Sequence, residues 1–392
     1  MIKSTSPCLG IFTNKPAFTV PLHVGISLVE PELKLAFMQK LETVFEDNYF
    51  TNNGPLVQKL EDEVAVIHGY KYGIAVCNAT VGLLLVLKVS DLKNEVILPS
   101  FTSPATVHAV LWQGLKPVFC DIDPKNLMLS SKDVERLLNP EVSAILGVDI
   151  FGNLSPIDEL VTLAQGRPVI IDAAHSFACK KESKHKPAIE VLSFHATKIF
   201  STFEGGMILT DDEDVMRELR YMRNYGFQDY DDIKTLGINA KLNEVSAAMG
   251  LASLDFMEER IEKLRRTREL YIEYLSPIEG LHVIDINQGT TSNYHYFSFL
   301  VDKDKFGIDR NLLLKVLRGE NIMAKRYFYP GCHKMKLHKP FYRDLPNTDL
   351  VSEKVICLPT GLPYPEMDVA KICKILQLCS EHGRKISEWD RV

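Results

Sequence analysis

Between residues 55 and 255, short runs rich in valine and isoleucine alternate with helical patterns of hydrophobic residues. Brief apolar runs of this kind are typical of strands that are buried on both faces of a mostly parallel sheet. The alternation therefore predicts a doubly wound α/β domain. The seven strand candidates are YGIAVC, EVILPS, KPVFCDI, SAILGVDIF, RPVIIDA, EVLSFH and GMILTD.

The last third of the chain has a different pattern. From Lys241 to Leu275 the sequence is almost continuously helical. It continues with the run SNYHYFSFLVD, a helix at 309–319, an aromatic loop and a last helix after KVICLPTG. We therefore expect a large domain over residues 1–255, which includes the N-terminal segment, and a smaller α+β domain over residues 256–392.

Composition excludes several classes of protein. The 392 residues carry a net charge of −6, which argues against nucleic acid or an anionic membrane surface as a partner. The chain contains no apolar run of eighteen residues, and no histidine, cysteine and aspartate cluster has metal-ligand spacing. Eight cysteines without a C-x-x-C pair or a visible secretory signal predict reduced thiols in a cytoplasmic protein. The G-x-G-x-x-G, P-loop and G-x-S-x-G motifs are absent from the sequence.

Three predicted strand ends carry unusual residues, and ligands of open α/β sheets bind at the carboxyl ends of strands. Asp172 ends the run RPVIID and is followed closely by His175. Ser193 ends another strand, and five residues later Lys198 is the only charged residue between Val191 and Phe203 apart from any protonated histidine. The stretch CNAT passes from a strand into a helix, so backbone N–H groups of the helix start would be open to an anion.

Each of these features also has a purely structural explanation. Lys198 could be a half-buried lysine that extends to solvent, Asp172 a helix cap, and His175 a packed core histidine. Together, an anion cradle, a strand-end acid and a lone lysine are the parts needed to hold pyridoxal phosphate. Burial lowers the pKa of a lysine, which then can form a Schiff base, and the acid would keep the ring nitrogen protonated.

Several sequence blocks resemble a known family. IIDAAHSF, SFHATKIFSTFEGG and GINAKLNEVSAAMG are similar to the signature blocks of the DegT/StrS-type sugar aminotransferases, which are pyridoxal phosphate enzymes. The resemblance covers nearly the whole chain. It implies fold type I, as in aspartate aminotransferase, with a mostly parallel seven-stranded sheet in the large domain and a small α+β C-terminal domain.

Within that family, CNAT, SFHATK, FEGG and PGCH are most similar to 4-aminotransferases that act on dTDP-4-keto-6-deoxyglucose in desosamine and viosamine pathways. The resemblance implies amination of this ketosugar with L-glutamate as amino donor, in amino-sugar or O-antigen biosynthesis. Amination of a 3-ketosugar or of a UDP-linked sugar, a sugar dehydratase and a non-catalytic sensor of the same fold are the alternatives. Dehydratase relatives carry histidine at the position of Lys198, which argues against that alternative.

The resemblance also assigns roles to individual residues. Lys198 would be the Schiff-base lysine and Asp172 the partner of the pyridine nitrogen, and these two form the catalytic pair. His175 stands where many relatives have glutamine beside the ring hydroxyl, and an imidazole can donate a hydrogen bond there. The full cofactor-binding set is Ala79, Thr80, Ser103, Asp172, His175, Ser193, Lys198 and Asn239.

Other implied roles concern a second subunit and the sugar. Asn239 matches an asparagine that reaches the phosphate from the neighbouring subunit, which implies a homodimer with shared active sites. The loop KRYFYPGCHK offers hydrogen-bond donors that suit sugar hydroxyls and a diphosphate. The predicted sugar-binding residues in this loop are Lys325, Tyr327, Tyr329 and His333.

Ser103 departs from the family pattern. Relatives usually have an aromatic residue after the threonine of the PSFT block, where it stacks on the cofactor ring. In this chain, Phe101 or another aromatic residue takes that place, or stacking is weaker and the affinity for the cofactor is lower.

Overall fold

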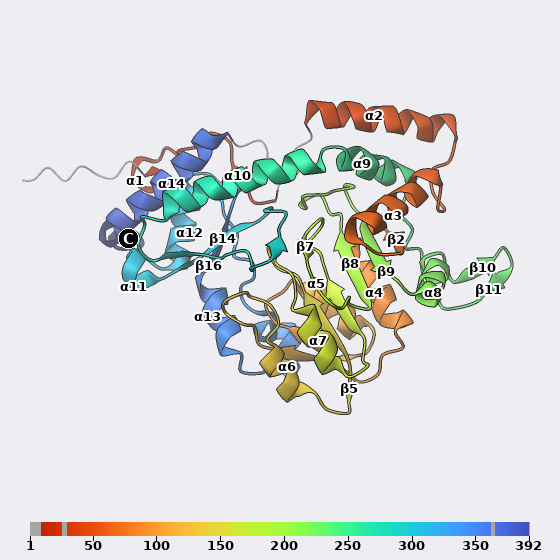
Figure 1. Cartoon of the computed structure of the whole chain (residues 1–392). Coiled ribbons are helices and arrows are strands. Elements are labelled where there is room, and N and C mark those ends of the chain that lie inside the picture. The colour runs from red at the N-terminus through yellow and green to blue at the C-terminus, as the bar shows by residue number, and fades with distance from the viewer. Residues whose placement is uncertain (1–8, 26–29, 362–364, 392) are drawn as a thin grey trace, which may run out of the picture.

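A seven-stranded sheet forms the centre of the computed structural model, which describes residues 9–25, 30–361 and 365–391. Its strands are β2 (Tyr72–Val76), β3 (Glu95–Pro99), β4 (Lys116–Cys120), β5 (Val142–Val148), β6 (Val169–Asp172), β8 (Ile189–Ser193) and β9 (Gly206–Thr210). They lie in the order β2-β9-β8-β6-β5-β3-β4 (Figure 1). β9 runs opposite to the other six strands: its pairings with β2 and β8 are antiparallel, and the remaining pairings of this sheet are parallel. The predicted mostly parallel seven-stranded sheet is therefore confirmed.

Helices cover both faces of this sheet. They are α3 (Pro55–His68), α4 (Ala79–Val89), α5 (Pro104–Trp112), α6 (Ser131–Leu137), α7 (Ile157–Ala164), α8 (Glu213–Arg223) and α9 (Glu244–Leu254). Ile97, Ile145 and Ile171 pack on the face that α3, α6, α7 and α9 cover. Their neighbours along the strands, such as Leu98 and Leu146, pack against α4, α5 and α8 because successive side chains point to opposite faces. Each such fully buried side chain contributes about 1.5–3 kcal/mol.

A smaller unit follows along the long helix α10 (Met257–Leu275), which extends away from the large sheet (Figure 1). Its antiparallel sheet consists of β12 (Leu281–Val283), β14 (Phe297–Val301) and β16 (Val355–Leu358). The aromatic rings of Tyr271 and Phe297 stack with centroids 4.5 Å apart between α10 and this sheet. The unit also contains α11 (Lys303–Phe306), α12 (Arg310–Gly319), two short 3₁₀ helices (Cys332–Lys334 and Lys336–Phe341), α13 (Pro346–Lys354), α14 (Glu366–Glu381) and α15 (Gly383–Trp389).

The N-terminal segment packs with the small unit, where the sequence had suggested the large one. Helix α1 (Gly10–Thr13) packs against α12, and β1 (Leu22–His23) pairs with β15 (Ile322–Met323). Leu9 and Phe18 are part of the apolar core of the small unit. These apolar side chains have their partners there. The domain ranges 1–255 and 256–392 stay predictions.

The stretch from Lys241 to Leu275, predicted to be almost continuously helical, contains two helices. α9 ends at Leu254 and α10 begins at Met257, with Phe256 at the turn between them. Phe256 packs beside Leu33 of α2 (Pro31–Glu46), which lies along α9 (Figure 1). Two glutamates in the first turn of α10 favour a new helix start at this point, because they face the positive end of the helix dipole.

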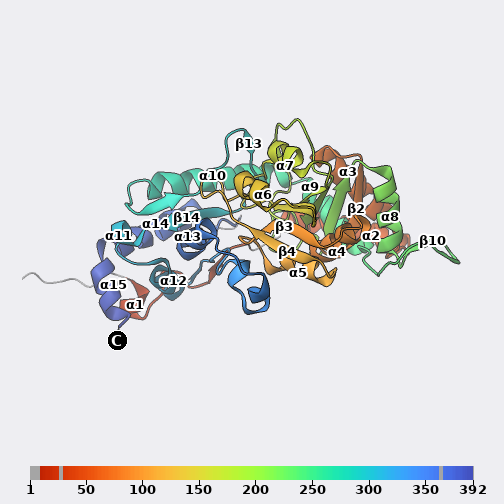
Figure 2. The same cartoon turned by 90° about the horizontal axis from the view of Figure 1, so that it is seen from below.

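Three further features complete the description. The hairpin of β10 (Phe227–Asp229) and β11 (Asp232–Ile233) projects from the body (Figures 1 and 2), and β7 (Lys180–Lys181) pairs with β13 (Thr290–Thr291). Across the described ranges, no helix combines the length and the apolar character needed to cross a membrane. The seven cysteines in these ranges are free thiols, and Cys8 lies outside them.

Candidate active site

A cavity of about 630 Å³ lies at the carboxyl ends of β5, β6 and β8, next to the first residues of α4 and α5. Seven residues that the sequence placed at a cofactor site line this cavity together. They are Ala79, Thr80, Ser103, Asp172, His175, Ser193 and Lys198. Tyr327 and Phe328 line it from the small unit. The cavity therefore lies where the two parts of the molecule meet.

Asp172 is the last residue of β6 and is almost completely buried. Its Oδ2 accepts a hydrogen bond from the Thr106 hydroxyl at 2.7 Å, and its Oδ1 accepts one from the backbone N–H of Ala174 at 3.2 Å. Burial raises the pKa of this carboxyl, while both hydrogen bonds and the positive charge of Lys198 oppose the rise. Among the residues that the structure describes, Lys198 is the only charged group that offsets the burial of this carboxylate, and a cation in the cavity would stabilise its ionised form further.

Lys198 follows β8 in the turn that passes along the cavity. Burial lowers the pKa of its amine to about 8, and the negative charge of Asp172 limits the fall. The amine lies 6.0 Å from the centre of the Tyr296 ring. Near neutral pH a useful fraction of the amine is therefore neutral, which is the form that attacks a carbonyl carbon.

The other end of the cavity suits an anion. Asn78 caps α4 by accepting a hydrogen bond from the N–H of Val81 at 2.9 Å, so the helix begins with the amides of Ala79 and Thr80 at the cavity. The first amides of a helix have no acceptor within it and carry part of the positive helix dipole. Gly206 of β9 permits this arrangement, because a Cβ there would lie 2.8 Å from the nitrogen of Ala79.

His175 stands among aromatic rings beside Asp172. Its ring lies 4.3 Å from that of Tyr296 and is stacked at about 6 Å on Phe328. Burial holds the pKa of this imidazole well below its ordinary value, so the ring is neutral. The N–H of Phe151 faces Nδ1 at 3.5 Å, which favours the tautomer with the proton on Nε2.

The structure shows whether Phe101 can replace the aromatic side chain that relatives have at the position of Ser103. Ser103 caps α5 by accepting from the N–H of Ala105 at 3.3 Å. Phe101 is fully buried and packs edge-on against Phe151 and Phe328, and it does not line the cavity. Phe101 therefore does not replace the missing aromatic side chain.

The predicted sugar-binding loop contributes less to the cavity than expected. Tyr327 reaches the cavity, but Tyr329 lies between the guanidinium groups of Arg310 and Arg326, at 4.4 and 4.7 Å. His333 is fully buried: its Nδ1 lies 2.6 Å from Ser100 Oγ and its Nε2 lies 3.3 Å from Asp349.

Lys325 and Asn239 also lie outside the lining of this cavity. Lys325 forms a backbone bridge with Cys357 of β16. Asn239 is exposed and forms a bridge with Asn224 near the projecting hairpin.

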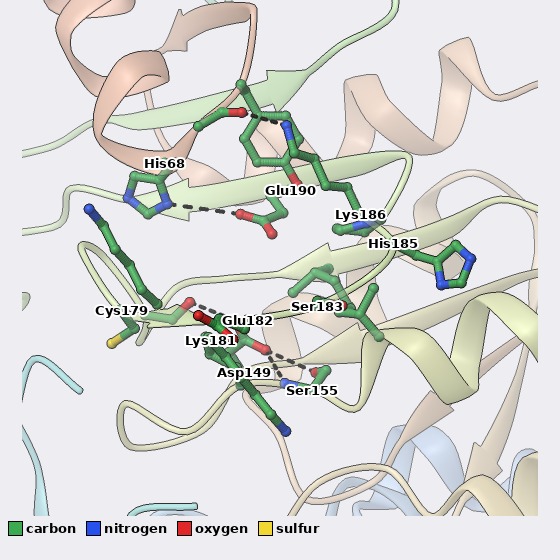
Figure 3. Close-up of a pocket in the computed structure, with 18 of the residues that line it drawn as sticks. His68, Asp149, Ser155, Cys179, Lys181, Glu182, Ser183, His185, Lys186 and Glu190 are labelled. Carbon is green, nitrogen blue, oxygen red and sulfur yellow. Dashed lines mark hydrogen bonds and ion pairs between the residues drawn. The ribbon is translucent and has the colours of Figure 1, made fainter. Parts of the chain in front are cut away.

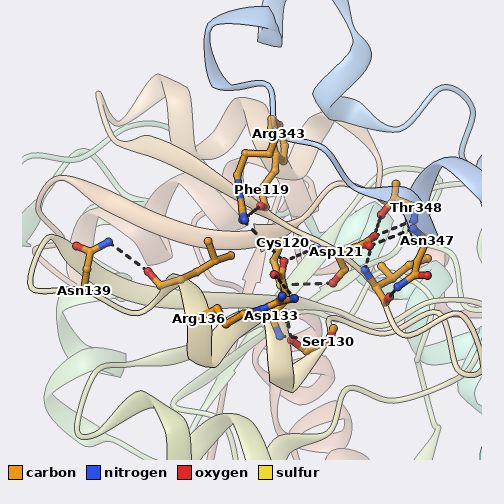
Figure 4. Close-up of polar contacts among 12 residues, drawn as sticks. Phe119, Cys120, Asp121, Ser130, Asp133, Arg136, Asn139, Arg343, Asn347 and Thr348 are labelled. Carbon is orange, nitrogen blue, oxygen red and sulfur yellow. Dashed lines mark hydrogen bonds and ion pairs between the residues drawn. The ribbon is translucent and has the colours of Figure 1, made fainter.

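A group of hydrogen bonds fixes the small unit to the edge of the large sheet (Figure 4). Asp121 follows β4 and accepts hydrogen bonds from the N–H groups of Asn347 and Thr348 at 3.0 and 2.8 Å, so it caps α13. Arg343 donates to the carbonyl oxygen of Phe119 at 2.7 Å. Since α13 carries Asp349, the contact partner of His333, these bonds also hold the loop that brings Tyr327 to the cavity.

A second cavity, of about 530 Å³, lies between the large sheet, α3 and α7 (Figure 3). Asp149 lines both cavities, and its carboxylate accepts hydrogen bonds from Ser155 and Ser176. Burial raises the pKa of Asp149 to about 6 and that of Glu190 to about 8, and it lowers the pKa of His68 to about 4. His68 Nδ1 faces Glu190 at 3.9 Å.

The family model described as the DegT/DnrJ/EryC1/StrS aminotransferase family matches residues 31–377. The chain belongs to this family. The predicted family and enzyme class are thereby confirmed, and the cofactor of this aminotransferase is pyridoxal phosphate.

Two relatives are named dTDP-4-amino-4,6-dideoxy-D-glucose transaminase. The protein from Shigella dysenteriae is 35% identical over 331 residues, which make up 82% of this chain and 90% of the relative. The protein from Escherichia coli is 33% identical over 363 residues, or 90% of this chain and 98% of the relative. The crystal structure of DesI in the presence of its TDP-sugar product has a TM-score of 0.93 at 35% identity and covers 98% of this chain and 99% of its own.

The residues around the first cavity fit pyridoxal phosphate by their chemistry. A buried carboxylate with few compensating charges suits a protonated ring nitrogen, and the helix start with the Ser193 hydroxyl suits a phosphate. The Lys198 amine suits the aldehyde carbon. Sequence reasoning missed Thr106, the hydrogen-bond donor to Asp172, although the signal T-x-x-x-T directly after a strand was present.

Proposed function

We propose that this aminotransferase converts dTDP-4-keto-6-deoxy-D-glucose to the 4-amino-4,6-dideoxy sugar, with L-glutamate as amino donor. The observation that carries the proposal is the single cavity in which Asp172, Lys198, Ser193 and the start of α4 meet. The substrate follows from the two transaminases named above and from DesI, all at 33–35% identity. The product would serve amino-sugar synthesis, such as that of an O-antigen, in the cytoplasm.

The residues of this chain have distinct tasks in such a reaction. The bound cofactor supplies an electron sink for the carbon that loses its proton. Asp172 would stabilise the positive charge of a protonated ring nitrogen, and Ser193 with the amides of Ala79 and Thr80 would hold the phosphate. Lys198, with its pKa of about 8, takes the proton from the α-carbon of the donor and later delivers one to the sugar carbon.

Tyr327 and Lys325 are the residues that we propose for the sugar nucleotide. Tyr327 is half-buried and lines the cavity, and its phenol could form a hydrogen bond with a sugar hydroxyl. Lys325 is two residues away and is half-buried as well. Tyr329 and His333 face other parts of their own chain and are left out of this proposal.

We further propose a homodimer in which Asn239 serves the phosphate site of the second subunit. Asn239 is exposed, and the neighbouring hairpin with the residues that follow it presents Tyr230, Ile233 and Leu236, which are 91%, 64% and 73% exposed. Apolar side chains at this exposure on a projecting element favour coverage by another chain. Because a dimer has twofold symmetry, each subunit would contribute its Asn239 to the active site of the other.

Mixed dimers test this shared site. Asn239→Ala and Lys198→Ala should each be inactive as pure dimers, because one loses a phosphate ligand and the other loses the amine. After joint unfolding and refolding, half of the dimers contain both variants, and each has one intact site of two. We expect about a quarter of wild-type activity. Proven mixed dimers without any recovery would mean that both residues act within one chain.

The substrate is tested by incubation with glutamate and a panel of dTDP- and UDP-linked 3- and 4-ketosugars, with Lys198→Ala as the control. We expect mass spectrometry and NMR to detect an axial or equatorial amine at C4 of the dTDP-linked sugar only. Amination at C3 or of a UDP-linked sugar alone would refute the proposed substrate. A cofactor absorption band that does not change on addition of glutamate would instead favour a non-catalytic sensor.

A further inference from the structure

Two buried threonines are connected to Asp172 by hydrogen bonds, and neither is used by the mechanism above. Thr102 follows β3, and Thr106 lies in the first turn of α5. Their side chains are 1% and 0% exposed. A buried hydroxyl loses its hydrogen bonds to water and must find a partner in the protein.

The start of α5 places both hydroxyls on one side. Ser103 caps the helix and Pro104 occupies its first position, which fixes the backbone at this point. Thr102 and Thr106 are four residues apart, and their Oγ1 atoms lie 2.9 Å from each other. Thr106 Oγ1 lies 2.7 Å from Asp172 Oδ2.

The hydrogen positions follow from the chemistry of the three groups. An ionised carboxylate can only accept, so the Thr106 hydroxyl donates its hydrogen to Asp172. Thr106 then has no second hydrogen, and the hydroxyl of Thr102 must donate to it. The two O–H dipoles therefore point the same way, toward the carboxylate.

The pair is held from its other end by the small unit. The Cys332 thiol donates to the carbonyl oxygen of Thr102 at 3.3 Å, and the N–H of Cys332 donates to that of Ser100 at 2.9 Å. Ser100 is also the hydroxyl partner of His333. The chain of contacts thus runs from the loop of the small unit through Thr102 and Thr106 to Asp172.

We propose that Thr106 is a positioning residue that Thr102 orients, and that the two aligned hydroxyls keep the Asp172 carboxylate charged and fixed in direction. Protonation of Oδ2 would require both hydroxyls to turn. The consequence for turnover rests on the proposed function, because a charged Asp172 matters only if a cationic ring nitrogen faces it. The effect of the two hydroxyls on the pKa of the Asp172 carboxyl is independent of the proposed function.

The first experiment needs no cofactor and no activity. Burial raises the folded-state pKa of Asp172, so its ionisation lowers stability progressively as pH rises above the unfolded value. Thr106→Val removes an opposing hydrogen bond and should raise that pKa further. Denaturant unfolding of the cofactor-free protein should therefore give a loss of stability that grows from pH 4 to pH 7. Thr106→Ser keeps the hydroxyl and should follow the wild-type curve.

Two other charged groups face Asp172 over this range. Burial lowers the pKa of Lys198 to about 8 and raises that of Asp149 to about 6. Both groups are present in wild type and in each Thr106 variant, so the difference between variant and wild type reports mainly on Asp172. A loss of stability that is the same at pH 4 and pH 7 would mean that Thr106 only fills space. That result would overturn the proposal whether or not the protein is an aminotransferase.

The second experiment uses the holoenzyme. A hydrogen bond to a charged group is worth about a ten- to hundredfold change in an equilibrium, so kcat of Thr106→Val should fall by about that factor while KM for glutamate changes little. Thr102→Val should have a smaller effect, and it should have almost none in the Thr106→Val background because both act through one hydrogen bond. Unchanged kcat in Thr106→Val would contradict the role of Thr106 as a positioning residue. Independent effects of the two substitutions would contradict the proposal that Thr102 acts through Thr106.

Discussion

The two cavities share Asp149 and are similar in size, at about 630 and 530 Å³, yet they differ in what their polar groups face. In the first cavity, Asp172 at the end of β6, Lys198 and the start of α4 line the same cavity. In the second, the carboxylate of Asp149 already accepts hydrogen bonds from two serines, and Glu190 faces His68.

Both cavities contain groups with strongly shifted pKa values, so such a shift records burial and does not by itself locate an active site. The first cavity lies over the carboxyl ends of parallel strands, where loops and helix starts of several crossovers come together. The second extends along the covered face of the sheet to Glu190, near the beginning of β8. The position of a cavity relative to the strand ends therefore identifies the active site better than shifted pKa values do.

The largest expected contrast is between two lysines. Lys198→Ala should fold and lose all turnover, and Lys198→Arg should fail as well because a guanidinium cannot form an imine. Lys186→Ala, the matched change at the second cavity, should keep activity within about twofold of wild type, since its amine binds Asp211 and the carbonyl oxygen of Gly69. Assay of glutamate-dependent amination checks all three. Activity in either Lys198 variant would refute the assignment.

Two aspartates provide the next contrast. Asp172→Asn retains the shape but loses the negative charge, so turnover should fall by about two orders of magnitude or more while cofactor binding persists. Asp149→Asn changes the carboxylate that lines both cavities, and it should lower turnover by less than about tenfold. Steady-state kinetics with circular dichroism as a folding control measures both. Equal effects would mean that the acids act as one unit.

Much of this contrast could be predicted from the sequence, because the strands and their ends are local signals. Asp172, Ser193 and Lys198 each follow a short apolar run, and parallel strands bring such ends to one edge. The sugar-binding loop could not be resolved in the same way. Tyr327 and His333 belong to one loop, and only tertiary packing turns His333 inward onto Ser100.

Thr106 and the N-terminal segment were missed for a related reason. The hydrogen bond from Thr106 to Asp172 joins residues 66 positions apart, so the local T-x-x-x-T pattern does not show which acid the threonines contact. Leu9 and Phe18 lie in the N-terminal segment that was assigned to the large domain, but most of their core partners follow residue 270 in the chain.

The smallest expected effect concerns stability at the second cavity. Burial raises the pKa of Glu190 to about 8, so the wild-type protein loses stability as pH rises from the unfolded value of about 4.5 toward 8. Glu190→Gln cannot ionise and should gain about 2–4 kcal/mol relative to wild type between pH 5 and pH 8. Urea unfolding at the two pH values measures this gain. Activity at pH 7 should stay within about twofold, and a larger loss would connect the second cavity to catalysis.

The most direct test of the account locates the cofactor bond. The holoenzyme is treated with borohydride, digested, and its peptides are sequenced by mass spectrometry. We expect the reduced pyridoxyl group on Lys198 alone, and no such group in Lys198→Ala. A label on Lys180, Lys181 or Lys186, which line the second cavity, would contradict the assignment of the active site to the first.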